Sequence, residues 1–356
     1  MPETETFQPD WISPPGETIS DILRDRNISV GEFARRIGQT QEQATDMLLG
    51  RSRITIGLAR RLVEVLGSSV EFWMARDFRY HQQIAKPGLA DHVWLRELPL
   101  GDMVRFGWVK HEAEPSQQLA ACLKFFGVPN IAAWHRTFGR IEQKFAFRKS
   151  PSFESRPASI AAWLRQGEIE AERIACGRWN AQRFERALSS IRMLTREKDP
   201  EVFIPKLRGI CAQAGVAVVI VRAPAGCHAS GATRYMTPQK ALLLLSFRFL
   251  SDDQFWFSIF HEAGHLLLHS HQELFIEDTD TVNVSEEREA NEFAARVLIP
   301  PENQPDLMRL RPNTYDIVRF ARRIGVSPGI VVGQLQHNGR IRHNHFNGLK
   351  RRYEWE

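Results

Sequence analysis

The sequence predicts a multi-domain fold: an all-α N-terminal domain, a helical middle region, and an α+β domain that pairs a small sheet with a long apolar helix. Three observations support this prediction. Short amphipathic helical patterns separated by glycines fill residues 17–85, and helical patterns continue to about residue 200. Two apolar runs of strand length follow, at 215–221 and 241–247. Strands followed by helices that close over them indicate a compact α+β layout.

Composition limits the class of protein. The chain has 356 residues, of which 43% are hydrophobic and 25% charged, as in ordinary soluble proteins with more than one domain. Its four cysteines form no C-x-x-C pair, which argues for a reducing compartment and against a thiolate zinc site. The first residues are polar and acidic, and no apolar run approaches a membrane span. We therefore expect a cytoplasmic protein with no membrane partner.

Changes in composition divide the chain into four expected segments. These are an N-terminal domain at 1–86, a helical linker or scaffold at 87–200, an α+β domain at 201–305 and a basic helical extension at 306–356. The last segment carries ten Lys and Arg residues against four acids, and the net charge of the whole chain is +5. A solvated basic face explains this simply, and a surface for DNA or an acidic partner is the alternative.

The N-terminal domain contains two short helical patterns joined by a tight turn at Gly38. Thr40 is an N-cap for the second helix, with Gln43 at the reciprocal position of a capping box. Two such helices within a small bundle are typical of a helix-turn-helix, whose second helix enters the major groove of double-stranded DNA. The expected operator contacts are made by Gln41, Gln43 and Thr45 to base edges and by Arg51 and Arg53 to phosphates.

The charge of this domain is nearly balanced. Residues 17–67 hold eight arginines and seven acids, and the second helix itself carries Glu42 and Asp46. Such a balance attracts phosphates weakly, so we expect a homodimer to gain affinity. The alternative is a helical bundle that contacts only proteins.

The long apolar helix expected after residue 251 contains the pattern H-E-x-x-H, formed by His261, Glu262 and His265. Residues four apart lie on one face of a helix, so both imidazoles can reach the same metal ion. Glu262 can then sit beside the water that completes the coordination shell. The alternative is a pair of histidines on an ordinary core helix.

A third ligand is expected from the helical pattern at 286–299, which ends before Pro300. Glu287 and Asn291 are four apart, which suits a ligand carboxylate followed by a group that holds a histidine in its tautomer. His271, six residues after His265, is a rival third ligand. Zinc peptidases that use this spacing carry a glycine at the position occupied here by Leu268. His269 lies one turn beyond His265 and is expected to contact a ligand or the helix end.

The chemistry expected of this site is metal-assisted hydrolysis of a peptide bond, with Glu262 as general base. The developing oxyanion needs a donor besides the metal, and Tyr235 and His228 are the candidates. If the strand at 242–247 lies at a sheet edge, it can pair an extended peptide over the metal.

Residues 14–85 resemble the Cro/C1-type (XRE) helix-turn-helix family, and most closely its HigA-like antidote group. The resemblance lies in Pro15-Gly16-Glu17-Thr18-Ile19, Gly50-Arg51-Ser52-Arg53-Ile54-Thr55 and Glu71-Phe72-Trp73. It implies DNA binding and a role in transcription regulation, with a toxin–antitoxin module as one setting.

Residues 205–305 resemble the ImmA/IrrE metallopeptidases, which implies a zincin-like, gluzincin-type domain. The matching residues are Ser230-Gly231-Ala232-Thr233-Arg234, His261-Glu262-Ala263-Gly264-His265 and Glu287-Arg288-Glu289-Ala290-Asn291. The resemblance assigns the metal to His261, His265 and Glu287 and the base role to Glu262. Zinc is the expected cofactor, with manganese or iron(II) as alternatives, and family members often act on helix-turn-helix repressors.

Together these features predict a DNA-binding regulator whose zinc-dependent endopeptidase domain cleaves a regulatory protein, such as a repressor or a toxin–antitoxin partner. One alternative is a non-catalytic antidote or repressor whose metal site is structural or vestigial. Another is an antidote that binds a toxin directly through the helical middle region.

Overall fold

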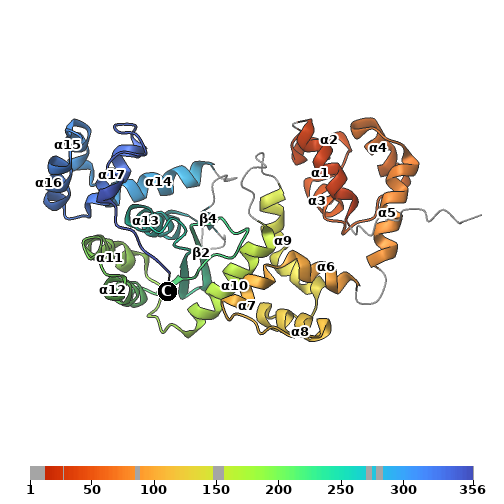
Figure 1. Cartoon of the computed structure of the whole chain (residues 1–356), viewed down its shortest axis with the longest axis horizontal. Coiled ribbons are helices and arrows are strands. Elements are labelled where there is room, and N and C mark those ends of the chain that lie inside the picture. The colour runs from red at the N-terminus through yellow and green to blue at the C-terminus, as the bar shows by residue number, and fades with distance from the viewer. Residues whose placement is uncertain are drawn as a thin grey trace, which may run out of the picture. The chain divides into compact units, whose positions relative to one another are not determined.

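The computed structural model describes residues 13–26, 28–84, 89–146, 156–269, 275–277 and 284–355. It is mostly helical and contains one small sheet (Figure 1). The chain divides into two compact units, Met1–Ala161 and Ala162–Glu356. The four segments expected from composition are finer than this division and stay a prediction. Among the described residues, no helix is both long enough and apolar enough to cross a membrane.

The first unit opens with five short helices, as the helical patterns predict. They are α1 (Pro15–Asp25), α2 (Val30–Arg36), α3 (Gln41–Leu48), α4 (Ile56–Leu66) and α5 (Val70–Ile84). Thr40 and Gln43 form the predicted capping box of α3. Gly38, between α2 and α3, has a φ of 62°, a left-handed conformation that favours glycine. The helices close over one apolar core, which includes Ile19, Phe33, Ile37, Met47, Leu62 and Trp73.

The rest of the first unit is helical and rich in aromatic residues. It contains α6 (Leu89–Glu97), α7 (Leu100–Arg105), α8 (Pro115–Phe126) and α9 (Ile131–Ala146). Trp94, Phe126 and Trp134 meet edge to face with ring centroids 5.6–6.0 Å apart. Such packing stabilises a core beyond its buried area. These aromatic residues therefore pack α6, α8 and α9 together.

Helix α10 (Pro157–Arg173) runs without a break through Gly167. A Cβ at Gly167 would lie 2.6 Å from the side chain of Leu244 in the sheet. The glycine therefore permits a close helix–sheet contact and does not end the helix. Trp163 supports the same contact, since its indole N–H donates to the carbonyl of Val221 at 3.0 Å.

The sheet of the second unit has the strand order β1-β3-β2-β4. Its strands are β1 (Val216–Ile220), β2 (Gly231–Thr237), β3 (Lys240–Leu245) and β4 (Phe275–Glu277). β3 pairs parallel with β1 and antiparallel with β2, and β2 pairs antiparallel with β4. The expectation that residues 242–247 form a substrate-binding edge is therefore wrong, because β3 is hydrogen-bonded on both sides. The edge strands are β1 and β4, and β4 was not predicted.

Helices cover both faces of this sheet. α10 lies against the face that carries Leu244 and Arg234, and α13 (Asp252–Leu268) lies against the face that carries Gly231 and Tyr235. The further helices are α11 (Ala181–Leu194), α12 (Pro200–Gln213), α14 (Val284–Leu298), α15 (Gln304–Arg309), α16 (Thr314–Ile324) and α17 (Pro328–His337). α13 packs against both α14 and α17, which makes it the central helix of the unit (Figure 1).

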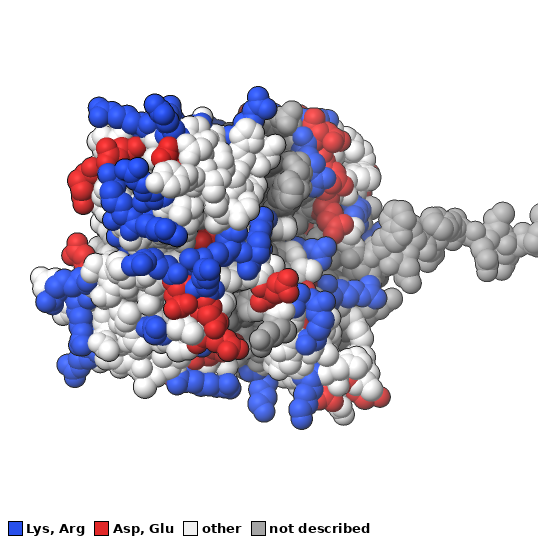
Figure 2. All heavy atoms as spheres, turned by 60° about the vertical axis from the view of Figure 1, so that its left-hand side comes forward, with Lys and Arg blue, Asp and Glu red and all other residues white. Residues whose placement is uncertain are grey.

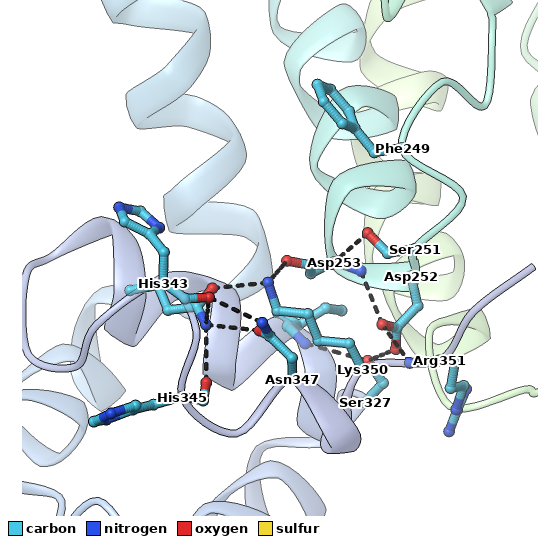
Figure 3. Close-up of polar contacts among 12 residues, drawn as sticks. Phe249, Ser251, Asp252, Asp253, Ser327, His343, His345, Asn347, Lys350 and Arg351 are labelled. Carbon is cyan, nitrogen blue, oxygen red and sulfur yellow. Dashed lines mark hydrogen bonds and ion pairs between the residues drawn. The ribbon is translucent and has the colours of Figure 1, made fainter.

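The last residues of the chain hold the N-terminal end of α13 (Figure 3). Asp252 accepts hydrogen bonds from the Ser327 hydroxyl at 2.7 Å and from the Arg351 backbone N–H at 3.0 Å. The Asp253 carboxylate forms an ion pair with Lys350 at 2.6 Å. Ser251 is the N-cap residue of α13, but its hydroxyl donates to Asp253 at 2.8 Å and caps no backbone N–H. We call residues 343–353 the C-terminal strap.

Candidate metal centre

The metal motif lies in the C-terminal half of α13, where small residues let α14 come close. A Cβ at Gly264 would lie 3.2 Å from the Cα of Ala290 on α14. Ala263, Ala290 and Ala294 are completely buried. This close approach brings Glu287 of α14 beside His261 and His265. Gly264 was recognised in the sequence as part of a motif, but its packing role was missed.

Three side chains converge at this point. The Nε2 atoms of His261 and His265 are 3.0 Å apart, and the Glu287 carboxylate oxygens lie 3.2 Å and 3.6 Å from them. Among the described residues, these three form a group whose ligand atoms all lie within 4.8 Å of one another. Tetrahedral zinc with bonds of about 2.0–2.2 Å separates its ligand atoms by about 3.4 Å. The spacing and the donor types therefore fit a zinc-sized ion.

The protonation states of Glu287 and His265 also suit a cation. Burial raises the pKa of Glu287, but the hydrogen bonds from His261 and His265 outweigh it and lower the pKa to about 2. Burial lowers the pKa of His265. An ionised carboxylate and neutral imidazoles are the forms that bind a metal ion.

Further polar contacts orient both imidazoles. Nδ1 of His261 lies 3.0 Å from Oδ1 of Asn291, which is one turn after Glu287 on α14. The tautomer that donates its Nδ1 N–H to this amide oxygen is the one in which Nε2 of His261 can bind a metal ion in place of its contact with Glu287. Nδ1 of His265 lies 2.9 Å from Nδ1 of His269, whose Nε2 lies 3.4 Å from Glu289. Asn291 and His269 thus each contact one of the two imidazoles.

Glu262 is fully buried and lies against the backbone of β2. A Cβ at Gly231 would come within 2.4 Å of its Oε1 atom. Only glycine leaves room there for the carboxylate in its present position. The sequence analysis quoted Gly231 as part of a motif without assigning this function to it, and a glycine at the start of a strand was the available signal.

Comparison with known proteins agrees with this geometry. Residues 213–335 match the IrrE N-terminal-like domain family, Peptidase_M78. The N-terminal part of the chain is similar to an uncharacterized HTH-type transcriptional regulator, YddM, of Escherichia coli (strain K12). The two are 35% identical over 60 residues, which are 17% of this chain and 64% of that relative.

The chain joins a helix-turn-helix region to an IrrE-like domain. The matched range of the IrrE-like domain contains the three converging side chains and Glu262. It also extends to residue 335, within α17, and so includes part of the segment expected to be a separate basic extension.

The two candidate oxyanion donors of the IrrE-like domain differ in position. The Tyr235 hydroxyl donates to the carbonyl of Leu266 at 3.1 Å, and burial raises its pKa to about 12. Tyr235 therefore stays protonated and ties β2 to α13. His228 lies between β1 and β2, where its carbonyl accepts a hydrogen bond from Arg248, and it is not one of the converging ligands. His271 lies outside the described residues.

In the helix-turn-helix region, the three residues expected to contact bases differ in accessibility. Gln41 and Gln43 are exposed on α3, although Oε1 of Gln43 accepts the backbone N–H of Thr40 at 3.0 Å. Thr45 is completely buried, and its hydroxyl donates to the carbonyl of Gln41 at 2.9 Å. Thr45 does not reach a DNA-facing surface, so we remove it from the expected contacts. Gln43 keeps its amide N–H groups and one lone pair of its amide oxygen for a base.

The two arginines expected to contact phosphates also differ. Arg51 is half-buried, donates to Nδ1 of His135 on α9 at 3.0 Å and lies 3.7 Å from Asp46. Burial and the Arg51 charge lower the pKa of His135 to about 4, which keeps it a neutral acceptor. Arg51 therefore joins α9 to the helix-turn-helix region and is corrected to a packing role. Arg53 bonds Asp77 at 2.8 Å but leaves 58% of its side chain exposed, so it stays available.

Proposed function

We propose that this protein is a DNA-binding transcriptional regulator whose IrrE-like domain is a metal-dependent endopeptidase acting on a regulatory protein, such as a repressor or a toxin–antitoxin partner. The observation that carries the proposal is the convergence of His261, His265 and Glu287 within 4.8 Å, on two helices inside the range matched by a peptidase family. The helix-turn-helix region supplies the DNA-binding part.

Each residue of the centre has a distinct proposed role. His261, His265 and Glu287 hold the cation, for which zinc is the first candidate and manganese or iron(II) the alternatives. When bound, such an ion lowers the pKa of water and polarises the peptide carbonyl. Glu262 accepts the proton of the attacking water and delivers it to the leaving nitrogen. Asn291 and His269 fix the orientation of the two imidazoles.

The substrate is proposed to bind as an extended peptide along β4. β4 uses one side to pair with β2, and among the described residues no strand occupies its other side. An edge strand next to the metal helix can add a substrate strand through backbone hydrogen bonds. This assignment replaces the edge that was expected at 242–247. Recognition through the backbone would leave the choice of substrate to its side chains.

Glu262→Gln tests the proposed hydrolase directly. The amide keeps the shape of the side chain but cannot accept the proton, so metal content should be unchanged while cleavage falls about a hundredfold or more. Metal is measured by elemental analysis, and cleavage is measured on purified products of neighbouring genes. Glu292→Gln, an exposed acid on α14, is the matched control.

Full cleavage by the Glu262→Gln variant would reject Glu262 as the base. Stoichiometric metal without cleavage in a proteome-wide survey of the wild type would instead favour the non-catalytic antidote or repressor. A structural zinc site usually has four protein ligands, whereas three converge among the described residues. That difference is why we place the hydrolase first.

Gln41→Ala tests the proposed DNA contact. Gln41 is exposed at the start of α3, and losing a bidentate contact with adenine should weaken binding about tenfold or more. The measurement is a titration of the purified protein with a duplex from its own promoter and with a scrambled duplex. Gln117→Ala, an exposed glutamine on α8, is the control. An unchanged preference for the promoter duplex would exclude Gln41 as a base contact.

A homodimer should protect two half-sites about one helical turn apart on the promoter DNA.

A further inference from the structure

A pocket of about 340 Å³ lies beyond the end of α17, away from any side chain assigned to the metal centre. It is lined by Arg340, Arg342 and His345 together with Ile341, Phe346 and Pro312. Its volume falls in the range of small-molecule sites, which is about 300–1,000 Å³. Two arginines and two aromatic-ring residues therefore line one cavity.

The charge of this pocket is not neutralised within the described part of the chain. Arg340 and Arg342 are exposed and form no ion pair there, whereas Arg323 pairs with Asp306 and Lys350 with Asp253. Figure 2 shows Lys and Arg side chains gathered on one face of the molecule, with smaller groups of acids beside them. Paired guanidinium groups match the charge and the oxygen geometry of a phosphate dianion.

The walls of the pocket are held in place before any ligand binds. Gln336 is 5% exposed, and its amide nitrogen donates to the carbonyls of His343 and His345 and to the Asn347 side chain, all at 3.0–3.1 Å. Lys350 donates to the Gln336 amide oxygen at 2.8 Å. Figure 3 shows this network, with both histidine rings directed away from it. A preorganised loop loses little entropy when it binds a ligand.

Phe346 provides the apolar side of the pocket in an unusual conformation. Its φ of 61° is in the left-handed region, which is costly for a bulky residue. Backbone strain of this kind is found most often at functional sites. The ring packs partly against the core and leaves one side to the cavity, next to His345. A planar aromatic group can stack there while its charge reaches the arginines.

We propose that this pocket binds a phosphate ester of a planar aromatic group, such as a mononucleotide. Arg340 and Arg342 bind the phosphate, and Phe346 and His345 contact the aromatic group. A carboxylate carries half the charge of a phosphate dianion and leaves one arginine uncompensated. This site is additional to the proposed peptidase and does not depend on it.

Calorimetry on the full chain with AMP as the probe tests the site. AMP should bind one to one. Inorganic phosphate should bind about tenfold more weakly because it lacks the aromatic group, and adenosine about a hundredfold more weakly because it loses both arginine contacts. Arg340→Ala together with Arg342→Ala should lower AMP affinity about a hundredfold, since each charge-assisted contact contributes about tenfold. Phe346→Leu should lower it severalfold. Arg319→Ala, an exposed arginine of α16, should leave it unchanged.

Other outcomes would overturn the assignment. If a chelator abolishes AMP binding, the phosphate sits at the metal centre. If the double variant keeps its circular dichroism spectrum and full AMP affinity, the arginines do not bind the ligand. If duplex DNA but not AMP depends on these arginines, the surface is an extended nucleic-acid contact. If Arg342→Lys binds as tightly as the wild type, charge alone is sufficient and paired recognition is rejected.

Discussion

Glu287→Ala is expected to lower the metal affinity of the purified protein by a hundredfold or more. Glu287 supplies the carboxylate of the group, and its oxygens lie 3.2 Å and 3.6 Å from the two imidazole nitrogens. Removing a group that only hydrogen-bonds to a ligand lowers metal affinity by about 10–100-fold, so removing a ligand should lower it by more. Elemental analysis and competition with a chromophoric chelator measure the change.

Neighbouring residues of α14 provide graded controls for this prediction. Asn291→Ala should lower metal affinity by about 10–100-fold, because it removes the partner of His261 Nδ1 without removing a ligand. Glu289 contacts His269, which in turn contacts His265, so Glu289 is one contact further from the ligands. Glu289→Ala should therefore lower metal affinity by a smaller factor. Glu292 is exposed, so Glu292→Ala should have no effect. An equal effect of all four substitutions would indicate general damage to α14, and no effect of Glu287→Ala would exclude it as a ligand.

The parts of this site that the sequence predicted are those that depend on local periodicity. A spacing of four on each helix places His261 beside His265 and Glu287 beside Asn291, whatever the rest of the fold does. The distance between the two helices depends on Gly264 meeting Ala290, which no local pattern specifies. For the same reason the central position of β3 was missed, because strand order is set by pairings distant in sequence.

The helix-turn-helix region shows a similar division. Thr45 is three residues before the buried Leu48 and one after the buried Ala44, so helical periodicity already places it close to the core side. That signal was present in the sequence and was overlooked. Arg51 is a different case, because its partner His135 lies 84 residues away. A long-range contact of this kind leaves no trace in the local pattern.

Lys350→Met is expected to destabilise the second unit by about 3–5 kcal/mol, the cost of leaving a buried carboxylate without its partner. Lys350 and Asp253 are 11% and 4% exposed at the side chain, and their charged atoms are 2.6 Å apart. A Cβ at Gly333 of α17 would lie 2.9 Å from the Asp253 carboxylate, so the site is too tightly packed for easy hydration. The measurement is the denaturant-induced unfolding transition of the full chain.

A second substitution separates the charge from the packing. In Lys350→Met with Asp253→Asn, no buried charge is left, so we expect at least about 1–2 kcal/mol of the loss to be recovered. Arg352→Ala changes an exposed cation of the same strap and should stay within about 0.5 kcal/mol of wild type. If the double variant is no more stable than Lys350→Met alone, the strap acts through its contact with Gln336. Recovery would show that the ion pair fixes the strap to the first turn of α13, the helix that ends at the metal ligands.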